Sequence, residues 1–244
     1  MNETMELLLA HKSVRRYLDK PVADEVRDLV VQAAQFAPSS CFYQAYTMIQ
    51  VNDTAVRQEL SALSGGQKCL LEAPLVLVFL ADFYRGSKYY ENIDPAILGS
   101  AEYYTVAVAD AALAGQKALI AAQSMGLGGV MVGGIRNDVS KVAALLKLPE
   151  LTFPLFALCL GYPADDPGQK PRLPMGLVLK QDVYDESADE RLMEEYNKTI
   201  AAYYRARSNG AIEDRWTERA GKSLMEETRE DVADYLRAHG FLQR

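Results

Sequence analysis

The chain has 244 residues, of which 49% are hydrophobic and 24% charged, which is normal usage for a soluble globular protein. Its formal net charge of -7 and its scattered Lys and Arg residues argue against nucleic-acid binding, which needs a basic face. Three cysteines without CxxC spacing and only two histidines argue against a Cys/His zinc site, so we expect no metal and reduced thiols in a cytoplasmic protein.

Hydrophobic periodicity predicts most elements in the first half of the chain. Helices are expected over residues 4–10, between Pro21 and Pro38, and from the N-cap Asp53 to about residue 63. Strands are expected over residues 45–51 and 75–80. The second strand is continuously apolar, as in a strand that is covered on both faces.

The second half opens with a long apolar helix, expected over residues 97–125. Asp110 and Lys117 interrupt its apolar stretch, which predicts a buried core helix and no membrane span, and we expect no signal peptide. Further strands are expected over 130–132 and 155–160, and further helices over 138–146, 188–207 and 223–238. This mixture without strict βα alternation predicts an α+β fold, a central sheet wrapped by helices.

Two glycine runs flank the short strand at 130–132. The run Gly126-Leu127-Gly128-Gly129 precedes a strand, whereas the dinucleotide fingerprint precedes a helix, so a Rossmann site is disfavoured. Gly133-Gly134 follows the strand. There it either forms a tight turn without a ligand or lets backbone amides approach a flat ligand.

Basic segments and isolated polar residues are the other candidates. His11–Arg15 and Lys170–Arg172 each hold donors that suit a phosphate. Ser39, Ser40 and Gln67 either serve a ligand's polar edge or are ordinary loop residues. Neither histidine neighbours a nucleophile in a known spacing. Either the chain is no enzyme, therefore, or a cofactor carries the chemistry.

Six segments in order resemble the larger-subunit branch of the nitroreductase superfamily: HKSVRRY, APSSCFYQAY, GGQK, SMGLGGVMVGGIRND, LFALCLGYPADDPGQKPRLP and YYRARSNG. The resemblance covers almost the whole chain. It implies a single nitroreductase-like domain over residues 1–244 with a mostly antiparallel sheet. It also implies a homodimer in which a helical extension, residues 188–244, packs on the partner subunit.

The same resemblance implies two FMN molecules at the dimer interface. Contacts to the phosphate and ribityl chain would come from His11, Lys12, Ser13, Val14, Arg15, Lys170, Pro171 and Arg172. Contacts to the ring would come from Ser39, Ser40, Gln67, Met131, Val132, Gly133 and Gly134. No side chain is expected to be catalytic, because FMN takes hydride from NADPH or NADH and passes two electrons to a nitroaromatic, quinone or flavin acceptor.

Two positions depart from the family pattern. Met131 stands where many relatives carry an aromatic residue, so different packing beside the ring is expected. Arg207 matches one basic position of the loop that binds the 2′-phosphate of NADPH, but Ala211, Ile212 and Glu213 replace further basic residues. We therefore expect use of both nucleotides, or a shift to NADH.

Three other functions stay open from the sequence. The chain is alternatively a flavin reductase that supplies reduced FMN to a partner monooxygenase, or a flavin-binding module without turnover. The third alternative is a phosphometabolite-binding protein that holds no flavin.

Overall fold

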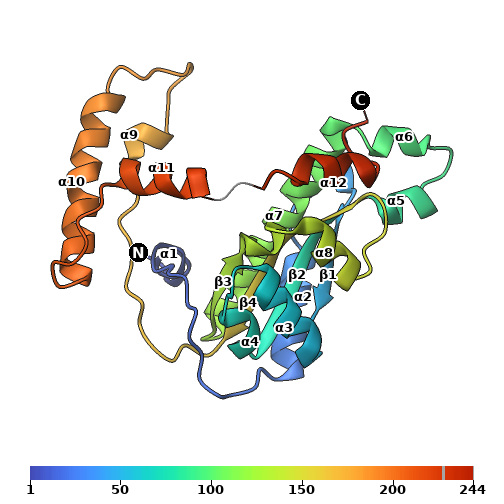
Figure 1. Cartoon of the computed structure of the whole chain (residues 1–244), viewed down its shortest axis with the longest axis horizontal. Coiled ribbons are helices and arrows are strands. Elements are labelled where there is room, and N and C mark those ends of the chain that lie inside the picture. The colour runs from blue at the N-terminus through green and yellow to red at the C-terminus, as the bar shows by residue number, and fades with distance from the viewer. Residues whose placement is uncertain (227–228, 244) are drawn as a thin grey trace. The chain divides into compact units, whose positions relative to one another are not determined.

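The structure is a computed structural model that describes residues 1–226 and 229–243 (Figure 1). It divides into two compact units, Met1–Pro167 with Arg229–Arg244, and Gly168–Thr228. The predicted single domain with an extension from residue 188 stays a prediction.

The first unit is built on a four-stranded antiparallel sheet. Its order is β1 (Tyr46–Gln50), β2 (Leu75–Asp82), β4 (Thr152–Gly161) and β3 (Gly128–Val132). Every residue of the central strand β2 is buried, because its continuous apolar run faces helices on both sides. The predicted α+β class, the antiparallel sheet and the doubly covered strand are confirmed.

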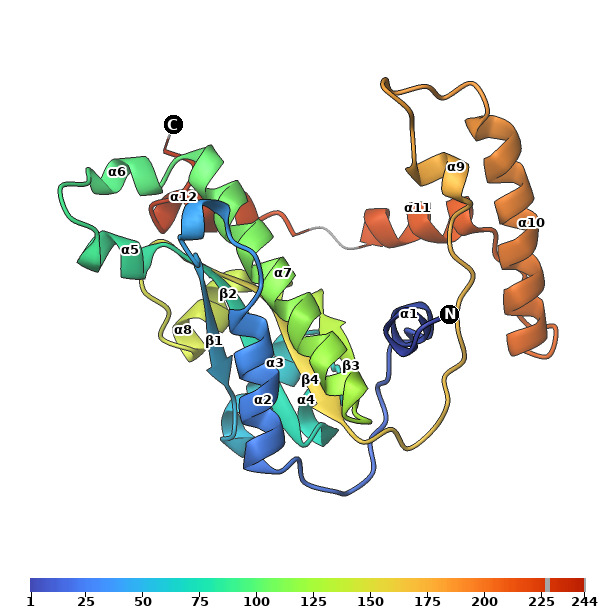
Figure 2. The ribbon, with the colours of Figure 1, turned by 180° about the vertical axis from the view of Figure 1, so that it is seen from behind.

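In chain order, the helices and 3-10 helices of the first unit are α1 (Glu3–Leu9), α2 (Asp24–Gln35), the 3-10 helix η1 (Ser40–Phe42), α3 (Thr54–Leu63), α4 (Cys69–Glu72), α5 (Tyr84–Tyr89), α6 (Pro95–Leu98), α7 (Ala101–Ser124), the 3-10 helix η2 (Gly133–Arg136), α8 (Val139–Leu145) and α12 (Val232–Ala238). The larger helices lie on the faces of the sheet, with α2 and α7 on one face and α3 and α8 on the other (Figures 1 and 2). Asp53 caps α3 as predicted, since its carboxylate accepts the Val56 amide at 3.0 Å.

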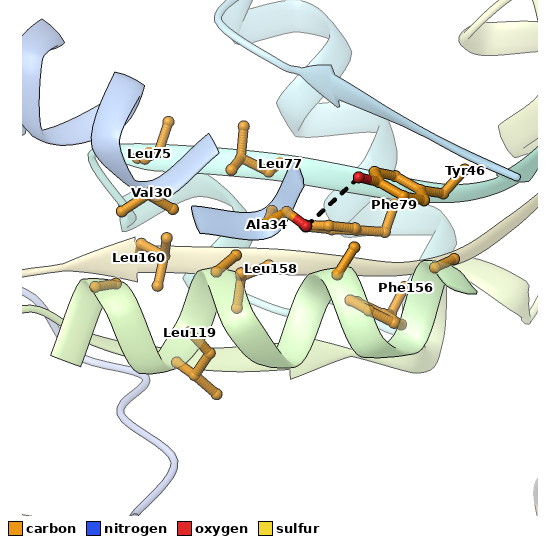
Figure 3. Packing of buried hydrophobic residues seen from close by; sticks show 14 of the residues in the cluster. Val30, Ala34, Tyr46, Leu75, Leu77, Phe79, Leu119, Phe156, Leu158 and Leu160 are labelled. Atoms are coloured by element: carbon orange, nitrogen blue, oxygen red, sulfur yellow. Dashed lines mark hydrogen bonds between the residues drawn. The ribbon is translucent and has the colours of Figure 1, made fainter. Parts of the chain in front are cut away.

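Helices α2 and α7 cover one face of the sheet. Leu75, Leu77 and Phe79 of β2 pack on that side, and the rings of Phe79 and Phe156 stack with centroids 5.3 Å apart (Figure 3). The alternate residues Val76 and Val78 pack with α3, α4 and α8 on the other face. Alternation along one apolar strand thus supplies both halves of the core.

Helix α7 is shorter than the predicted helix over 97–125. Pro95–Leu98 forms the separate helix α6, and α7 begins after Ser100, whose hydroxyl accepts the Tyr103 amide at 3.4 Å. Among the described residues, α7 is the one helix long and apolar enough to cross a membrane, and half of its most apolar window is buried within the protein. The buried side packs on the sheet, as predicted for a core helix.

The second unit holds α9 (Met175–Val178), α10 (Asp189–Arg207) and α11 (Trp216–Glu226). The ring of Trp216 packs on the buried Tyr196 of α10 with centroids 6.0 Å apart. The prediction of one helix over 223–238 was wrong. Trp216 anchors α11 in the second unit, whereas Tyr235 and Leu236 of α12 are buried in the core of the first.

The segment that precedes α2 runs beside β3 at the edge of the sheet. The Val14 amide donates to the Gly129 carbonyl at 3.0 Å, and Ser13 pairs with Gly129 in a parallel bridge. A Cβ on Gly128 would lie 2.6 Å from Cγ2 of the buried Val14. Glycine at position 128 is therefore what lets this segment pack against the sheet.

Gly128→Ala is expected to lower the free energy of unfolding by about 1–3 kcal/mol, because the new methyl group overlaps the Val14 side chain. Val14→Ala alone should also destabilise, through the cavity that it leaves. The double variant should be more stable than the sum of the two losses predicts, since the smaller residue 14 makes room. Urea unfolding of the four proteins measures this coupling, and strict additivity would contradict the proposed packing.

Candidate functional site

Most predicted site residues of the first unit lie along β3. Ser13 and Val14 pair with Gly129 near the start of the strand. At its far end, Gly134 lies against the turn that carries Gln67: a Cβ on Gly134 would approach the Ser64 carbonyl oxygen to 2.8 Å. The edge of one strand thus brings together residues that are about 50 to 120 positions apart in the sequence.

The His11–Arg15 segment is held in place by its neighbours. His11 Nδ1 lies 3.1 Å from Nε2 of Gln123 on α7. The Tyr17 hydroxyl lies 2.8 Å from the Val14 carbonyl and 3.1 Å from the Cys159 carbonyl, and it is shared between these two acceptors. Burial raises the pKa of Tyr17 well above its ordinary value, so the hydroxyl stays a donor.

The cations of this segment differ in their partners. Lys12 forms an ion pair with Asp166 at 2.7 Å, and Arg16 forms one with Asp165 at 3.3 Å. Arg15 is exposed, and within residues 1–226 and 229–243 its guanidinium makes neither an ion pair nor a hydrogen bond. Arg15 is therefore the cation of this segment that is available to an external anion.

The end of β3 carries two polar groups that sequence reasoning missed. A Cβ on Gly133 would lie 3.1 Å from the Arg136 guanidinium, which also donates to the Leu155 carbonyl. The Ser64 hydroxyl is buried, and it is the one buried side-chain polar atom without a hydrogen-bond partner in the part of the chain that the structure describes. A buried unpaired hydroxyl beside a glycine turn is the kind of group that a ligand satisfies.

Met131 and Val132 lie between these two ends of the strand. Val132 is buried and packs with α3, α4 and α8, whereas Met131 is half-buried and packs on the α7 side. The half-buried thioether is compatible with the predicted change of packing at Met131, which stays a prediction.

Ser39 and Ser40 lie elsewhere, in the loop between α2 and β1. The Ser40 amide donates to the buried Asp110 carboxylate at 3.1 Å, and the Ser39 hydroxyl accepts the Gln44 amide at 3.3 Å. Three non-glycine residues of this loop, Cys41, Phe42 and Gln44, have left-handed φ values of 44°, 59° and 51°. Such backbone is strained and needs support from its surroundings.

The predicted residues Lys170, Pro171 and Arg172 belong to the second unit. They line a pocket of about 610 Å³ whose other walls are aromatic and aliphatic, with rings from Tyr196, Tyr203, Tyr204 and Trp216. Lys170 and Arg219 lie 5.9 Å and 4.6 Å from the centroid of the Tyr204 ring. That this triplet and Arg15 bind the same phosphate stays a prediction.

Two acidic residues of the segment between α10 and α11 pair with arginines of these helices. Arg205 pairs with Glu213 at 2.5 Å, and Arg219 pairs with Asp214 at 3.0 Å. The bond from Arg205 lowers the pKa of the Glu213 carboxyl, so this acid is ionised at neutral pH. The predicted nucleotide residue, Arg207, donates to the Tyr203 hydroxyl at 3.3 Å.

His239 stacks on Tyr235, and its Nδ1 lies 2.9 Å from the Tyr235 carbonyl. Cys41, Cys69 and Cys159 are free thiols. No group of three or more potential metal ligands occurs in residues 1–226 and 229–243.

Comparison with known proteins identifies relatives over most of the chain. The model of the Nitroreductase family matches residues 8–162, and the model of the Nitroreductase family C-terminal domain matches residues 170–244. The chain is 44% identical over 217 residues to an oxygen-insensitive NADPH nitroreductase of Salmonella typhimurium, with 89% of each chain covered. It is 41% identical over 222 residues to an FMN reductase (NADPH) of Bacillus subtilis, again with 89% of each covered.

Solved structures are similar throughout. The NfrA1 nitroreductase from B. subtilis has a TM-score of 0.96 at 38% identity, covering 99% of this chain and 100% of that chain. The NADPH:FMN oxidoreductase from Vibrio harveyi, complexed with NAD⁺, has a TM-score of 0.90 at 34% identity, with both chains covered completely (100%).

Proposed function

The chain belongs to the nitroreductase family, and we propose that it is an FMN-dependent NAD(P)H oxidoreductase that reduces nitroaromatics, quinones or free flavins. Relatives that span 89% of the chain are named as NADPH nitroreductase and FMN reductase. The observation in the structure that carries the proposal is the arrangement along β3, where Arg15, the Gly133-Gly134 turn and the unpaired Ser64 hydroxyl flank one strand.

These residues fit a flavin mononucleotide. Arg15, Lys170 and Arg172 form no ion pair in the described residues and would hold the phosphate, each charge-assisted hydrogen bond contributing about 1.5–3 kcal/mol. Glycine at 133 and 134 lets the Arg136 guanidinium and the Ser64 backbone pack closely against that turn, and the backbone amides of the turn would face the flavin ring. FMN, when bound, would supply the hydride and two-electron chemistry, while the chain binds it, orients it and shields it.

A homodimer is part of this proposal. Large apolar side chains are exposed on both units, among them Phe36 (73%) and Phe42 (81%) in the first and Leu224 (79%) and Met225 (82%) in the second. Exposed apolar surface of this kind marks an interface, and a second copy of the chain would cover it. In that dimer Ser39 and Ser40 would contact the flavin of the partner subunit. We further propose that the enzyme is cytoplasmic.

A second candidate is a flavin reductase that supplies reduced FMN to a monooxygenase. The relatives named FMN reductase and NADPH-flavin oxidoreductase favour it. Rates with free FMN, compared with rates with a nitroaromatic acceptor, distinguish the two functions.

Purified protein should be yellow, with the visible absorption of bound oxidised flavin. This absorption should bleach anaerobically with NADPH or NADH and return when a nitroaromatic or a quinone is added. Yellow protein that neither nucleotide bleaches would instead be a flavin-binding module. A colourless preparation that takes up no FMN would contradict the proposed function.

Arg15→Ala should weaken FMN binding by about 10- to 100-fold, the equivalent of one charge-assisted hydrogen bond. Its matched control is Arg16→Ala, because Arg16 is the neighbouring cation but already pairs with Asp165. Equilibrium dialysis against FMN measures both. Arg172→Ala should behave like Arg15→Ala, with Arg191→Ala of the Arg191–Glu195 pair as its control. Wild-type affinity in both Arg15→Ala and Arg172→Ala would contradict the phosphate assignment.

We propose that both NADH and NADPH are used, because Glu213 neutralises Arg205 where relatives carry cations. Glu213→Gln should raise kcat/KM for NADPH about two- to fivefold and leave NADH unchanged, as expected for one exposed charge pair. Glu195→Gln, which frees Arg191 instead, is the control. A strong preference of the wild type for NADPH that Arg207→Ala abolishes would show that the replaced cations are not needed.

A further inference from the structure

Asp110 is an acid in the apolar, sheet-facing side of α7. It is 2% exposed, and its helical neighbours Ala107, Ala111 and Ala114 are fully buried. Carboxylates are almost never buried to this extent without partners, because removal from water disfavours the charge. The partners of Asp110 therefore indicate what this residue does.

Both carboxylate oxygens accept backbone amides of the loop between α2 and β1. Oδ1 accepts the Ser40 amide at 3.1 Å, and Oδ2 accepts the Ala45 amide at 3.0 Å. One side chain thus holds the two ends of a loop that contains the three left-handed residues Cys41, Phe42 and Gln44. A bidentate anion suits this task, since each oxygen satisfies one donor.

Arg85 supports the same loop from its carbonyl side. Its Nη2 donates to the Gln44 carbonyl at 2.7 Å and to the Tyr46 carbonyl at 2.9 Å. Within the loop, the Tyr43 ring packs edge-on against Phe83 and Tyr103, with centroids 5.9 Å away in each case. One loop conformation is thus fixed in three ways. Asp110 accepts its amides, Arg85 donates to its carbonyls, and the Tyr43 ring packs into the aromatic cluster.

We propose that Asp110 and Arg85 are positioning residues of the flavin site. Neither is expected to touch the cofactor: they hold the backbone of the loop so that Ser39 and Ser40 face the bound FMN. This inference rests on the proposed function. Asp110 then has a role in cofactor binding in addition to any role in the stability of α7.

The nearly isosteric variant Asp110→Asn tests the assignment. Its amide has one acceptor oxygen, so it can satisfy either Ser40 or Ala45, while its NH₂ group faces the other amide donor. In the full-length protein, FMN affinity should fall at least tenfold, which corresponds to about 1.4 kcal/mol. At saturating FMN, the visible circular dichroism of the bound flavin should also change, because the ring environment differs.

Arg85→Ala provides a second variant, since Arg85 lies at the surface and its removal leaves α7 intact. It should produce the same two changes in smaller measure. The control is Val142→Ala, a fully buried position on α8 in the other face's core cluster, where a loss of stability should leave FMN affinity and flavin dichroism unchanged.

The outcomes separate the two proposals. Wild-type protein that binds and turns over FMN, together with Asp110→Asn and Arg85→Ala variants that match its affinity and dichroism, would overturn the positioning role and leave the proposed function standing. If Asp110→Asn does not fold, wild-type behaviour of Arg85→Ala overturns it. Wild-type protein that binds no FMN would overturn both.

Discussion

Close backbone packing at the edge strand β3 is the constraint on which the candidate site depends. Glycine at 128 lets Val14 lie against the strand, and glycine at 134 lets the turn after α3 approach its other end. The His11–Arg15 segment and the turn that carries Gln67 each pack against this strand. A side chain at either glycine would separate them, because the nearest atoms are already within 2.8 Å of the missing Cβ.

Ion pairs within the protein determine which basic side chains remain available to an anionic ligand. The chain has 33 acidic and 26 basic side chains, and several basic side chains near the candidate residues pair with acids, as Lys12 does with Asp166 and Arg205 with Glu213. Exposed pairs of this kind contribute little to stability. However, each pair neutralises a basic side chain that would otherwise compete for the anionic ligand. In an acidic protein, the arginines without acid partners are therefore the ones that an anionic ligand meets as full charges.

The sequence alone predicted the elements whose signals are local. The apolar run of β2 and the cap at Asp53 are such signals, and both were found where they were expected. The roles of three residues were not predicted, because their contacts depend on the tertiary structure. Asp110 was interpreted only as an interruption of an apolar helix, because its amide partners are about 65 to 70 residues away. Ser64 carries no sequence signal of its own, since only the fold places it beside the glycine turn. Arg136 follows that turn closely in the sequence, but the fold sets the contact of its guanidinium with the Leu155 carbonyl.

Strain and support are matched in the loop between α2 and β1. A left-handed conformation costs a non-glycine residue about 1–2 kcal/mol, and three residues of this loop adopt it. Asp110 and Arg85 together provide four charge-assisted hydrogen bonds to its backbone, each of about 1.5–3 kcal/mol. A relaxed turn would need neither the strain nor a buried carboxylate. The combination makes sense where one loop conformation must exist before a ligand arrives, because the ordering cost is then borne by folding and not by binding.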